Sequence, residues 1–268
     1  MMLYVWFVIA GAFAGVCAGL FGVGGGMIIV PVLVWIFTAY HFSPEVVTHL
    51  AIGTSLATII VTSISSLTAH NKRGGVRWDI WRNMALGLVI GSLIGAGVAD
   101  AIDGDVLQAI IGVGALLISF RMLFFSNKEQ PSKPLPPIGI QFGAGASIGL
   151  ASSIFGIGGG SLTVPFLNWV GLSMKQSIGT AAACGLPIAL AGAVGFAWFG
   201  KDMMNLPDGT IGFVHITGFL FISAASFITA KVGAKLAHQL PALMLKRAFG
   251  ILLLFAGGQL LLSGVGVL

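Results

Sequence analysis

Eight long apolar stretches follow one another along the chain, separated by short polar segments. Two of them, residues 3–38 and 138–170, are much longer than one membrane crossing, and a run of glycines interrupts each in its middle. The other six are residues 46–69, 83–99, 106–124, 176–199, 211–230 and 243–264. Because a helix needs about 20 mostly apolar residues to span a bilayer, this pattern predicts an all-α, polytopic bundle of transmembrane helices.

The composition supports the same class. Charged residues make up 8% of the chain and hydrophobic residues 57%, with a mean hydropathy of +1.02. Soluble domains carry about 25% charged residues, so an integral membrane protein is expected. The stretch 84–99 does not alternate in polarity as the strands of a membrane β-barrel would.

One glycine-rich motif occurs twice and divides the chain into two similar halves. Phe21–Pro31 reads FGVGGGMIIVP, and Phe155–Pro165 reads FGIGGGSLTVP. The two copies are 134 residues apart in a chain of 268, which indicates an internal duplication. We predict a first repeat over residues 1–125, a proline-rich cytoplasmic linker over 126–137, and a second repeat over 138–268.

Each glycine run is expected to break its long apolar stretch into two short helices. Glycine in a helix interior costs about 1 kcal/mol relative to alanine, so a continuous helix through either motif is unfavourable. Each half is therefore predicted to contain a glycine-broken helical hairpin followed by three membrane helices. The sequence leaves open whether the hairpins cross the membrane fully or turn back part-way.

The charges of the polar segments predict that the two repeats have inverted topology. Residues 70–82, 121–133 and 231–247 carry net charges of +3, +2 and +4, whereas 100–105 and 200–208 carry −3 and −1. Under the positive-inside rule the first three segments are cytoplasmic and the other two face outward. Corresponding segments of the two halves then lie on opposite sides, as inverted repeats require.

The glycine turns are the strongest candidates for a binding site. A glycine turn exposes backbone N–H groups with no Cβ in the way, and the helix that follows presents the positive end of its dipole. Inverted-repeat transporters hold anionic groups at such half-helix ends near the bilayer midplane. The candidate backbone donors are Gly22, Gly24, Gly25, Gly26, Gly156, Gly158, Gly159 and Gly160. The alternative is that these glycines only permit a tight turn and close packing.

Hydroxyl groups close to these turns could complete the site. Ile52–Ser55 and Ile178–Ala181 read IGTS and IGTA, and Thr54, Ser55 and Thr180 are candidate side-chain contacts. Ser161 follows the second glycine run directly. The second motif also has Ser152 and Ser153 beside it, where the first has Ala18 and Gly19, so the site could be asymmetric.

The residue pattern predicts no cofactor site and no reactive centre. The acidic residues all fall in polar segments or at the ends of apolar stretches, so no intramembrane carboxylate is available for proton or sodium coupling. We predict no catalytic residue, no metal site, no cofactor and no nucleic-acid partner. The expected partners are a small anionic substrate and the lipid bilayer, with a homo-oligomer possible.

The doubled motif at Phe21–Pro31 and Phe155–Pro165, with the Ile-Gly-Thr elements at 52–54 and 178–180, resembles the TauE/SafE family of membrane permeases, often called sulfite exporters. The resemblance covers essentially the whole chain. It implies a multi-pass secondary transporter of the bacterial inner membrane that works by alternating access. Its implied substrates are small sulfur-containing or organic anions such as sulfite or sulfoacetate.

Two other classes of function remain as alternatives. An anion channel would use the same glycine turns, because channels and carriers share lining chemistry. A more distant alternative is an intramembrane hydrolase with Ser161 as nucleophile and His215 as base. No Gly-x-Ser-x-Gly elbow supports that reading.

Overall fold

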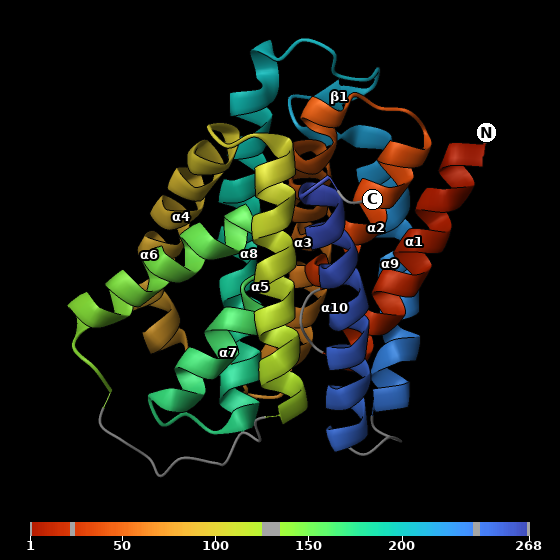
Figure 1. The fold of residues 1–268 in the computed structure, drawn as a ribbon. Coiled ribbons are helices and arrows are strands. Elements are labelled where there is room, and N and C mark those ends of the chain that lie inside the picture. Colours follow the sequence, from red (N-terminus) through yellow and green to blue (C-terminus); the bar gives the residue numbers. More distant parts are fainter. Residues whose placement is uncertain (1, 22–24, 125–134, 238–241, 267–268) are drawn as a thin grey trace.

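The chain folds into a bundle of α-helices (Figure 1). The computed structural model describes residues 2–21, 25–124, 135–237 and 242–266. The helices in these residues are α1 (Met2–Phe21), α2 (Gly26–Ala39), α3 (Pro44–Lys72), α4 (Trp78–Asp100), α5 (Gly104–Phe124), α6 (Ile138–Ile154), α7 (Gly160–Trp169), α8 (Met174–Phe199), α9 (Ile216–Ala237) and α10 (Ala242–Gly264). Most of the linker predicted at 126–137 lies outside the described residues.

The polytopic helical bundle expected from the sequence is confirmed. Five helical segments are long and apolar enough to cross a bilayer, namely Pro44–Lys72, Trp78–Asp100, Gly104–Phe124, Met174–Asp202 and Arg247–Gly264. The last of these lies within α10, and the fourth extends α8 through the short 3-10 helix Gly200–Asp202. The chain is therefore a multi-pass membrane protein.

Both long apolar stretches are broken at the glycine runs. In the first half the break separates α1 from the 14-residue helix α2, and in the second it separates α6 from the 10-residue helix α7. A helix rises 1.5 Å per residue, so α2 and α7 are each too short to span a bilayer. They are half-helices that return toward the end from which their hairpin started.

A small departure from the expected helices precedes α9. Residues 211–215 lie in the apolar stretch 211–230, but the structure forms a two-stranded hairpin of β1 (Thr210–Ile211) and β2 (Val214–His215) before the helix begins. Thr210 pairs with His215 and Ile211 with Val214. Gly212 takes a positive φ of 51° in the turn, a conformation that favours glycine.

The helices α3 and α8 form the centre of the bundle and run antiparallel. They pack on each other, and their spans are the most buried in the described part of the chain. Helix α8 begins near the end of α3. A Cβ on Gly179, in the first turns of α8, would meet the carbonyl of Gly75, which follows α3. Helix α5 begins at the opposite end of α3, where an ideal Cβ on Gly104 would lie 3.3 Å from the Glu45 carbonyl oxygen.

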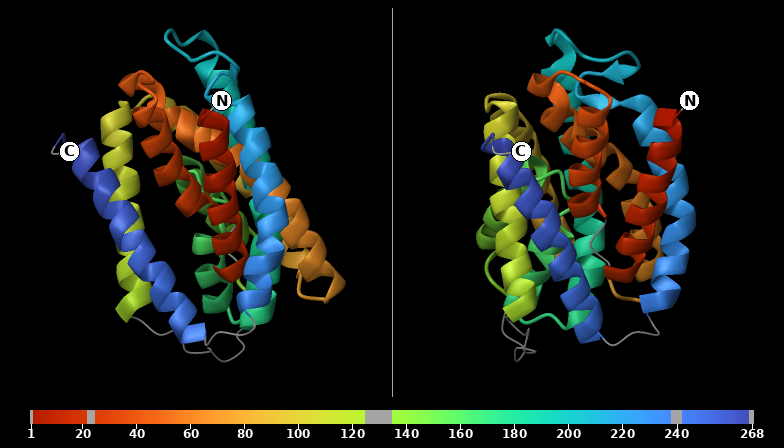
Figure 2. Two further views of the ribbon diagram at one scale, coloured as in Figure 1. Left: turned by 90° about the vertical axis from the view of Figure 1, so that its right-hand side faces the viewer. Right: turned by 45° about the vertical axis from the view of Figure 1, so that its right-hand side comes forward.

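Two parallel helix pairs flank this centre, and each joins one helix from each half. Helix α1 packs along α9 (Figure 2), and α4 packs along α6. In the second pair an ideal Cβ on Gly95 would lie 2.5 Å from the Leu150 carbonyl oxygen, and one on Gly91 would meet the Ala146 carbonyl. Small residues permit such close approach of helices in lipid. Both pairs therefore depend on glycine faces.

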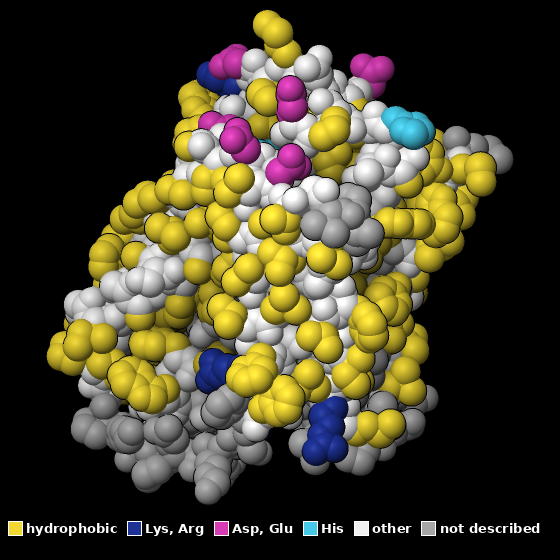
Figure 3. Space-filling view, viewed as in Figure 1, with side chains coloured by type: hydrophobic (Ala, Val, Ile, Leu, Met, Phe, Trp, Pro, Cys, Tyr) yellow, Lys and Arg dark blue, Asp and Glu magenta, His cyan; other side chains and the backbone are white. Residues whose placement is uncertain are grey.

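Charge separates toward the two ends of the bundle (Figure 3). Acidic side chains gather at the end where α3 and α5 begin, and most of the visible Lys and Arg side chains lie at the other end. Between the ends the surface is predominantly hydrophobic. This is the distribution expected of a protein with an apolar belt in lipid and two polar ends in water.

Candidate functional site

Each half-helix begins at a glycine in the left-handed conformation. Gly25, the N-cap of α2, has φ 76° and ψ −18°, and Gly159, the N-cap of α7, has φ 73° and ψ −17°. Left-handed backbone is strained for residues with a Cβ but open to glycine. The two copies of the motif therefore form the same turn. We call residues 25–27 the first tip and residues 156–161 the second tip.

The two tips contact each other. An ideal Cβ on Gly26 would lie 2.6 Å from the carbonyl oxygen of Gly156 and 3.0 Å from the Cα of Ile157. The Ser161 hydroxyl also donates a hydrogen bond to the Met27 sulfur at 3.4 Å. Ser161 and Met27 are corresponding positions of the duplicated motif, so the tips meet through equivalent residues.

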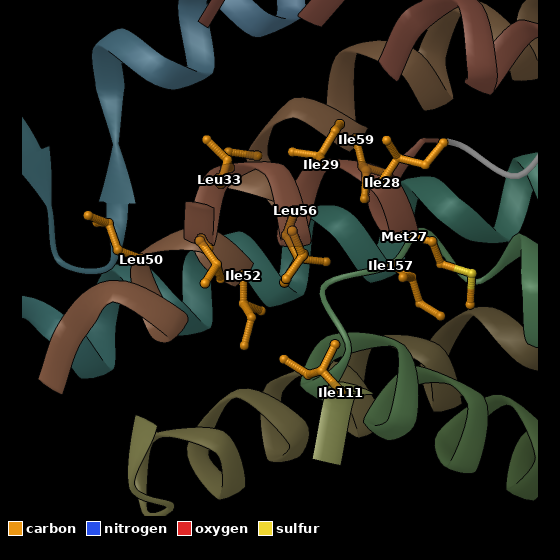
Figure 4. Close-up of a cluster of buried hydrophobic side chains, with 14 of the residues drawn as sticks. Met27, Ile28, Ile29, Leu33, Leu50, Ile52, Leu56, Ile59, Ile111 and Ile157 are labelled. Atoms are coloured by element: carbon orange, nitrogen blue, oxygen red, sulfur yellow. The ribbon is translucent and has the colours of Figure 1, made fainter. Parts of the chain in front are cut away.

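The meeting point lies half-way along the two central helices. Ideal Cβ atoms on Gly26 and Gly158 would lie 2.7 and 2.8 Å from side-chain atoms of Ile59, close to the middle of α3. One on Gly185, close to the middle of α8, would lie 2.8 Å from the Gly158 carbonyl oxygen. Figure 4 shows Met27, Ile59 and Ile157 within one cluster of buried apolar side chains. The hairpins thus turn back at mid-depth.

Backbone donors are unused at both tips. The N–H groups of Gly25, Gly26 and Met27 have no hydrogen-bond partner among the described residues, and the same holds for Gly158, Gly159, Gly160 and Ser161. The first helical N–H groups lack intrahelical acceptors by geometry, and neither N-cap glycine has a side chain to supply one. Each tip therefore presents several donors at the positive end of a helix dipole. Gly22 and Gly24 lie outside the described residues.

Ser55 is the predicted hydroxyl that reaches a tip. Its side chain is fully buried, and its Oγ donates to the Gly156 carbonyl oxygen at 2.9 Å. This bond ties the middle of α3 to the second tip. Position 181, the corresponding residue in α8, is alanine, so the contact has no counterpart at the first tip.

The predicted contacts Thr54 and Thr180 are engaged away from the tips. The Oγ1 of Thr54 accepts a hydrogen bond from the His215 N–H at 2.9 Å, and the Oγ1 of Thr180 accepts one from the Arg77 N–H at 3.0 Å. His215 directly precedes α9, and Arg77 directly precedes α4. The two threonines therefore fix the starts of equivalent helices, each in the opposite half of the chain.

The glycine before each threonine makes this contact possible. A Cβ on Gly53 would collide with the carbonyl oxygen of Phe213, and a Cβ on Gly179 would collide with that of Gly75. Both Gly-Thr pairs thus work as clamps in which the glycine admits a loop backbone and the threonine accepts its N–H. We call them the Gly-Thr clamps.

Further hydroxyls surround the second tip, and three of them have no partner. Ser152 and Ser153 on α6 and Thr163 on α7 are fully buried, and their hydroxyl oxygens form no hydrogen bond within the described part of the chain. The sequence singled out the two serines but not Thr163. The sequence could have pointed to Thr163, because it is a polar residue four positions after the N-cap glycine of an apolar helix.

Little free space remains where the tips meet. A cavity of about 10 Å³ adjoins them, lined by residues that include Met27, Val30, Phe155 and Ile157. Such a volume holds about one water molecule. The lining is apolar, and Phe155 lies against Gly114 of α5. The described residues are therefore packed closely around the tips, and a ligand could enter between them only after they separate or a covering side chain moves.

Neither Ser161 nor His215 is arranged for hydrolysis. The Ser161 hydroxyl donates its hydrogen bond to the Met27 sulfur. The His215 Nδ1 accepts the N–H of Gly218, and its ring lies among Phe7, Phe37 and Phe42. The two residues are thus engaged with separate partners, in contrast to the hydrogen-bonded pair that an activated serine needs.

An ion pair at the basic end of the bundle lies at the start of α4. Arg77 and Asp79 form a two-point interaction, with hydrogen bonds of 2.9 and 2.6 Å. Because the Thr180 clamp holds the Arg77 N–H, this charged loop is anchored directly to α8.

Comparison with known proteins assigns the chain to a family. The family model for the sulfite exporter TauE/SafE matches residues 7–260. The chain is similar to a probable membrane transporter protein of Haemophilus influenzae, with 35% identity, covering 92% of this chain and 93% of that protein. It is also similar to the probable membrane transporter protein YdhB of Bacillus subtilis, with 27% identity over 90% and 96% of the two chains.

A similar relation extends to an archaeon. The probable membrane transporter protein MJ0441 of Methanocaldococcus jannaschii is 25% identical, covering 95% of this chain and 96% of that protein. No solved structure matches the chain. The family match over nearly the whole length, together with the doubled glycine motif and the membrane fold, shows that this chain belongs to the TauE/SafE sulfite exporter family of membrane transporters.

Proposed function

We propose that the protein is a secondary transporter that binds a small anion between the two tips and exposes it alternately to the two sides of the membrane. The observation that carries this proposal is the meeting of two glycine tips at mid-depth, each with backbone donors that no described residue accepts, beside a half-helix. Unpaired N–H groups at a helix start favour negative charge. The substrate class that fits best is a sulfur oxyanion or organosulfonate, such as sulfite or sulfoacetate.

The arrangement of the hairpins supports alternating access. Helix α2 leads directly into α3 at the acidic end, and α7 leads directly into α8 at the basic end. The hairpins thus open toward opposite ends, as an inverted duplication would place them. Inverted-repeat carriers work by moving one part against another around a fixed midplane site. Separation of the tips toward one end or the other would open the site to that side.

The charge distribution gives an orientation. The end with excess Lys and Arg faces the cytoplasm under the positive-inside rule, and the acidic end then faces outward. On this basis the α1–α2 hairpin enters from outside and the α6–α7 hairpin from the cytoplasm. We propose that the protein lies in the bacterial inner membrane, since its relatives in Haemophilus influenzae and Bacillus subtilis are named as probable membrane transporter proteins.

The first test is thermal stabilisation of the purified full-length protein by sulfite, sulfate, thiosulfate, sulfoacetate, taurine, acetate and chloride. A ligand that binds only the folded state stabilises it by about 2.7 kcal/mol at a hundredfold excess over Kd. We expect a shift with a sulfur oxyanion or sulfonate, and its loss in Gly159→Val. A Cβ at this position would meet Ile188, and the positive φ disfavours valine. The variant Gly143→Ala serves as control, because no atom lies within 4 Å of its added Cβ.

Flux measurements in proteoliposomes then separate a carrier from a channel. A carrier saturates and exchanges internal for external anion, whereas a channel passes current with little saturation. Absence of any shift and any flux with the whole panel would refute anion transport. A shift that persists in Gly159→Val would remove the second tip from the binding site.

A further inference from the structure

Two unpartnered hydroxyls converge on one point of the second tip. An ideal Cβ on Gly159 would lie 3.3 Å from Oγ1 of Thr163 and 3.7 Å from Oγ of Ser152. Both side chains are fully buried, and neither oxygen has a hydrogen-bond partner among the described residues. They come from the two arms of the hairpin, α6 and α7, and flank the turn where α7 begins.

Other helical hydroxyls of this chain bond to their own backbone. Serine and threonine in helices commonly donate to their own backbone carbonyl three or four residues earlier. The side chains of Thr58, Thr62, Thr68, Ser147, Ser226 and Thr229 all do so here. Thr163 could reach the Gly159 carbonyl in the same way, but that carbonyl already accepts two backbone N–H groups, those of Leu162 at 3.0 Å and of Thr163 at 2.7 Å. A buried hydroxyl left without a partner is unfavourable, so the pair calls for an acceptor.

The first tip has apolar groups at the corresponding places. Around Gly25 the matching positions are Ala18 and Ile29, whose Cβ and Cδ1 atoms lie 3.3 and 3.7 Å from the ideal Cβ. Both pairs are offset by 134 residues from Ser152 and Thr163. The two turns thus have the same backbone and opposite side-chain chemistry. Only the second tip can add hydroxyl donors to its backbone N–H groups.

We infer that the two tips are not equivalent and that the substrate's oxyanion is held mainly by the second tip. The donors are the Ser152 and Thr163 hydroxyls and the N–H groups of Gly160 and Ser161, which no described residue accepts. This inference rests on the proposed anion transport. The donors are neutral and come from both arms of the hairpin, α6 and α7, so they fit an oxyanion whose separate oxygens each accept a bond. A halide offers a single atom and would leave some of these donors unpaired.

The side chain of Ile188 covers this site in the present structure. It lies against the position that a Cβ on Gly159 would occupy and is fully buried. Ile188 follows Pro187, which cannot donate a hydrogen bond within α8. The carbonyl that this proline leaves free, that of Ala183, accepts the Trp81 indole N–H at 3.0 Å. An oxyanion takes its place on the second tip when Ile188 moves aside.

The test compares dissociation constants of the purified full-length protein for sulfite, methanesulfonate and chloride. Variants Ser152→Ala and Thr163→Val remove one hydroxyl each, and Thr163→Ser keeps the hydroxyl. The control is Ser223→Ala, which removes another buried, unpartnered hydroxyl from α9. We expect each hydroxyl deletion to raise the oxyanion Kd about tenfold or more, as for a hydrogen bond to a charged group. Thr163→Ser and the control should stay within about twofold.

Folding is followed in the same samples by the melting temperature without ligand. Loss of an unpartnered hydroxyl should leave that temperature unchanged or raise it, so weaker binding would not reflect unfolding. Wild-type Kd values in both Ser152→Ala and Thr163→Val would overturn the hydroxyl site, while Gly159-dependent stabilisation would still uphold anion binding at the tips. Chloride binding as tight as that of the oxyanions would also overturn it. Failure of the wild type to bind any of the three would refute both proposals.

Discussion

A single methyl group on Gly26 tests whether the tips must touch. Gly26 is the first residue of α2 and is buried. An ideal Cβ there would lie 2.6 Å from the Gly156 carbonyl oxygen, which is 0.8 Å short of the 3.4 Å at which ordinary contact begins. It would also lie 2.7 Å from Cδ1 of Ile59. The variant Gly26→Ala therefore has to push the two tips apart.

The size of the effect follows from the nature of the obstacle. The Ile59 methyl can rotate away, but the Gly156 carbonyl is backbone and is held by the Ser55 hydroxyl. Overpacking of this kind costs about 1–3 kcal/mol. Because native proteins are stable by about 5–15 kcal/mol, Gly26→Ala should still fold. We expect a lower melting temperature and a large loss of anion flux.

The matched control is the same substitution at a glycine with open surroundings. Gly143 lies on α6, is exposed, and would place its Cβ more than 4 Å from any neighbouring atom. Gly143→Ala should leave flux intact and leave stability unchanged or raised by up to about 1 kcal/mol, because alanine favours the helix. The assay is thermal unfolding in detergent together with flux into proteoliposomes. Wild-type stability and flux in Gly26→Ala would refute the claim that tight contact between the tips matters.

Three further predictions concern the elements that hold the tips in place. Thr54→Val should lower the free energy of unfolding by about 1–3 kcal/mol, because the His215 N–H is left buried without its acceptor; equal unfolding midpoints for variant and wild type in denaturant would contradict the Gly-Thr clamp. Gly91→Ala should separate α4 from α6 and lower the melting temperature, and an unchanged melting temperature would show that this pair does not need its close contact. Asp79→Asn should cost less than about 1 kcal/mol because its pair with Arg77 is exposed. A larger loss of stability in Asp79→Asn would contradict this expectation.

The architecture could be predicted from the sequence because the relevant signals are long or repeated. Apolar length alone identifies membrane helices, and the two copies of the motif fixed where each hairpin breaks. The identical backbone angles at Gly25 and Gly159 follow from residue type, since glycine adopts this turn without strain. The contact between the tips was not predictable in this way, because the sequence left open whether the hairpins cross the membrane fully or turn back part-way.

The directions in which individual side chains point could not be predicted from the sequence in the same way. Thr54 and Thr180 were expected to face the tips, yet each accepts an N–H from a loop of the other half. A helix has several faces, and which one a threonine occupies depends on the rotation of the helix against distant segments. Ser55 lies one residue further round α3 and does reach the second tip. Thr163 was overlooked because a lone threonine among apolar residues ordinarily bonds to its own helix.

The pairing of α1 with α9 and of α4 with α6 has a consequence for biosynthesis. The partner of α4 is made within a few tens of residues, whereas α9 begins at residue 216, long after α1 has left the ribosome. Until then the glycine face of α1, with Gly11 and Gly15, has no α9 to receive it. Contacts between such distant segments form late and slowly. The first hairpin must therefore remain in the membrane without its α9 neighbour until most of the chain has been made.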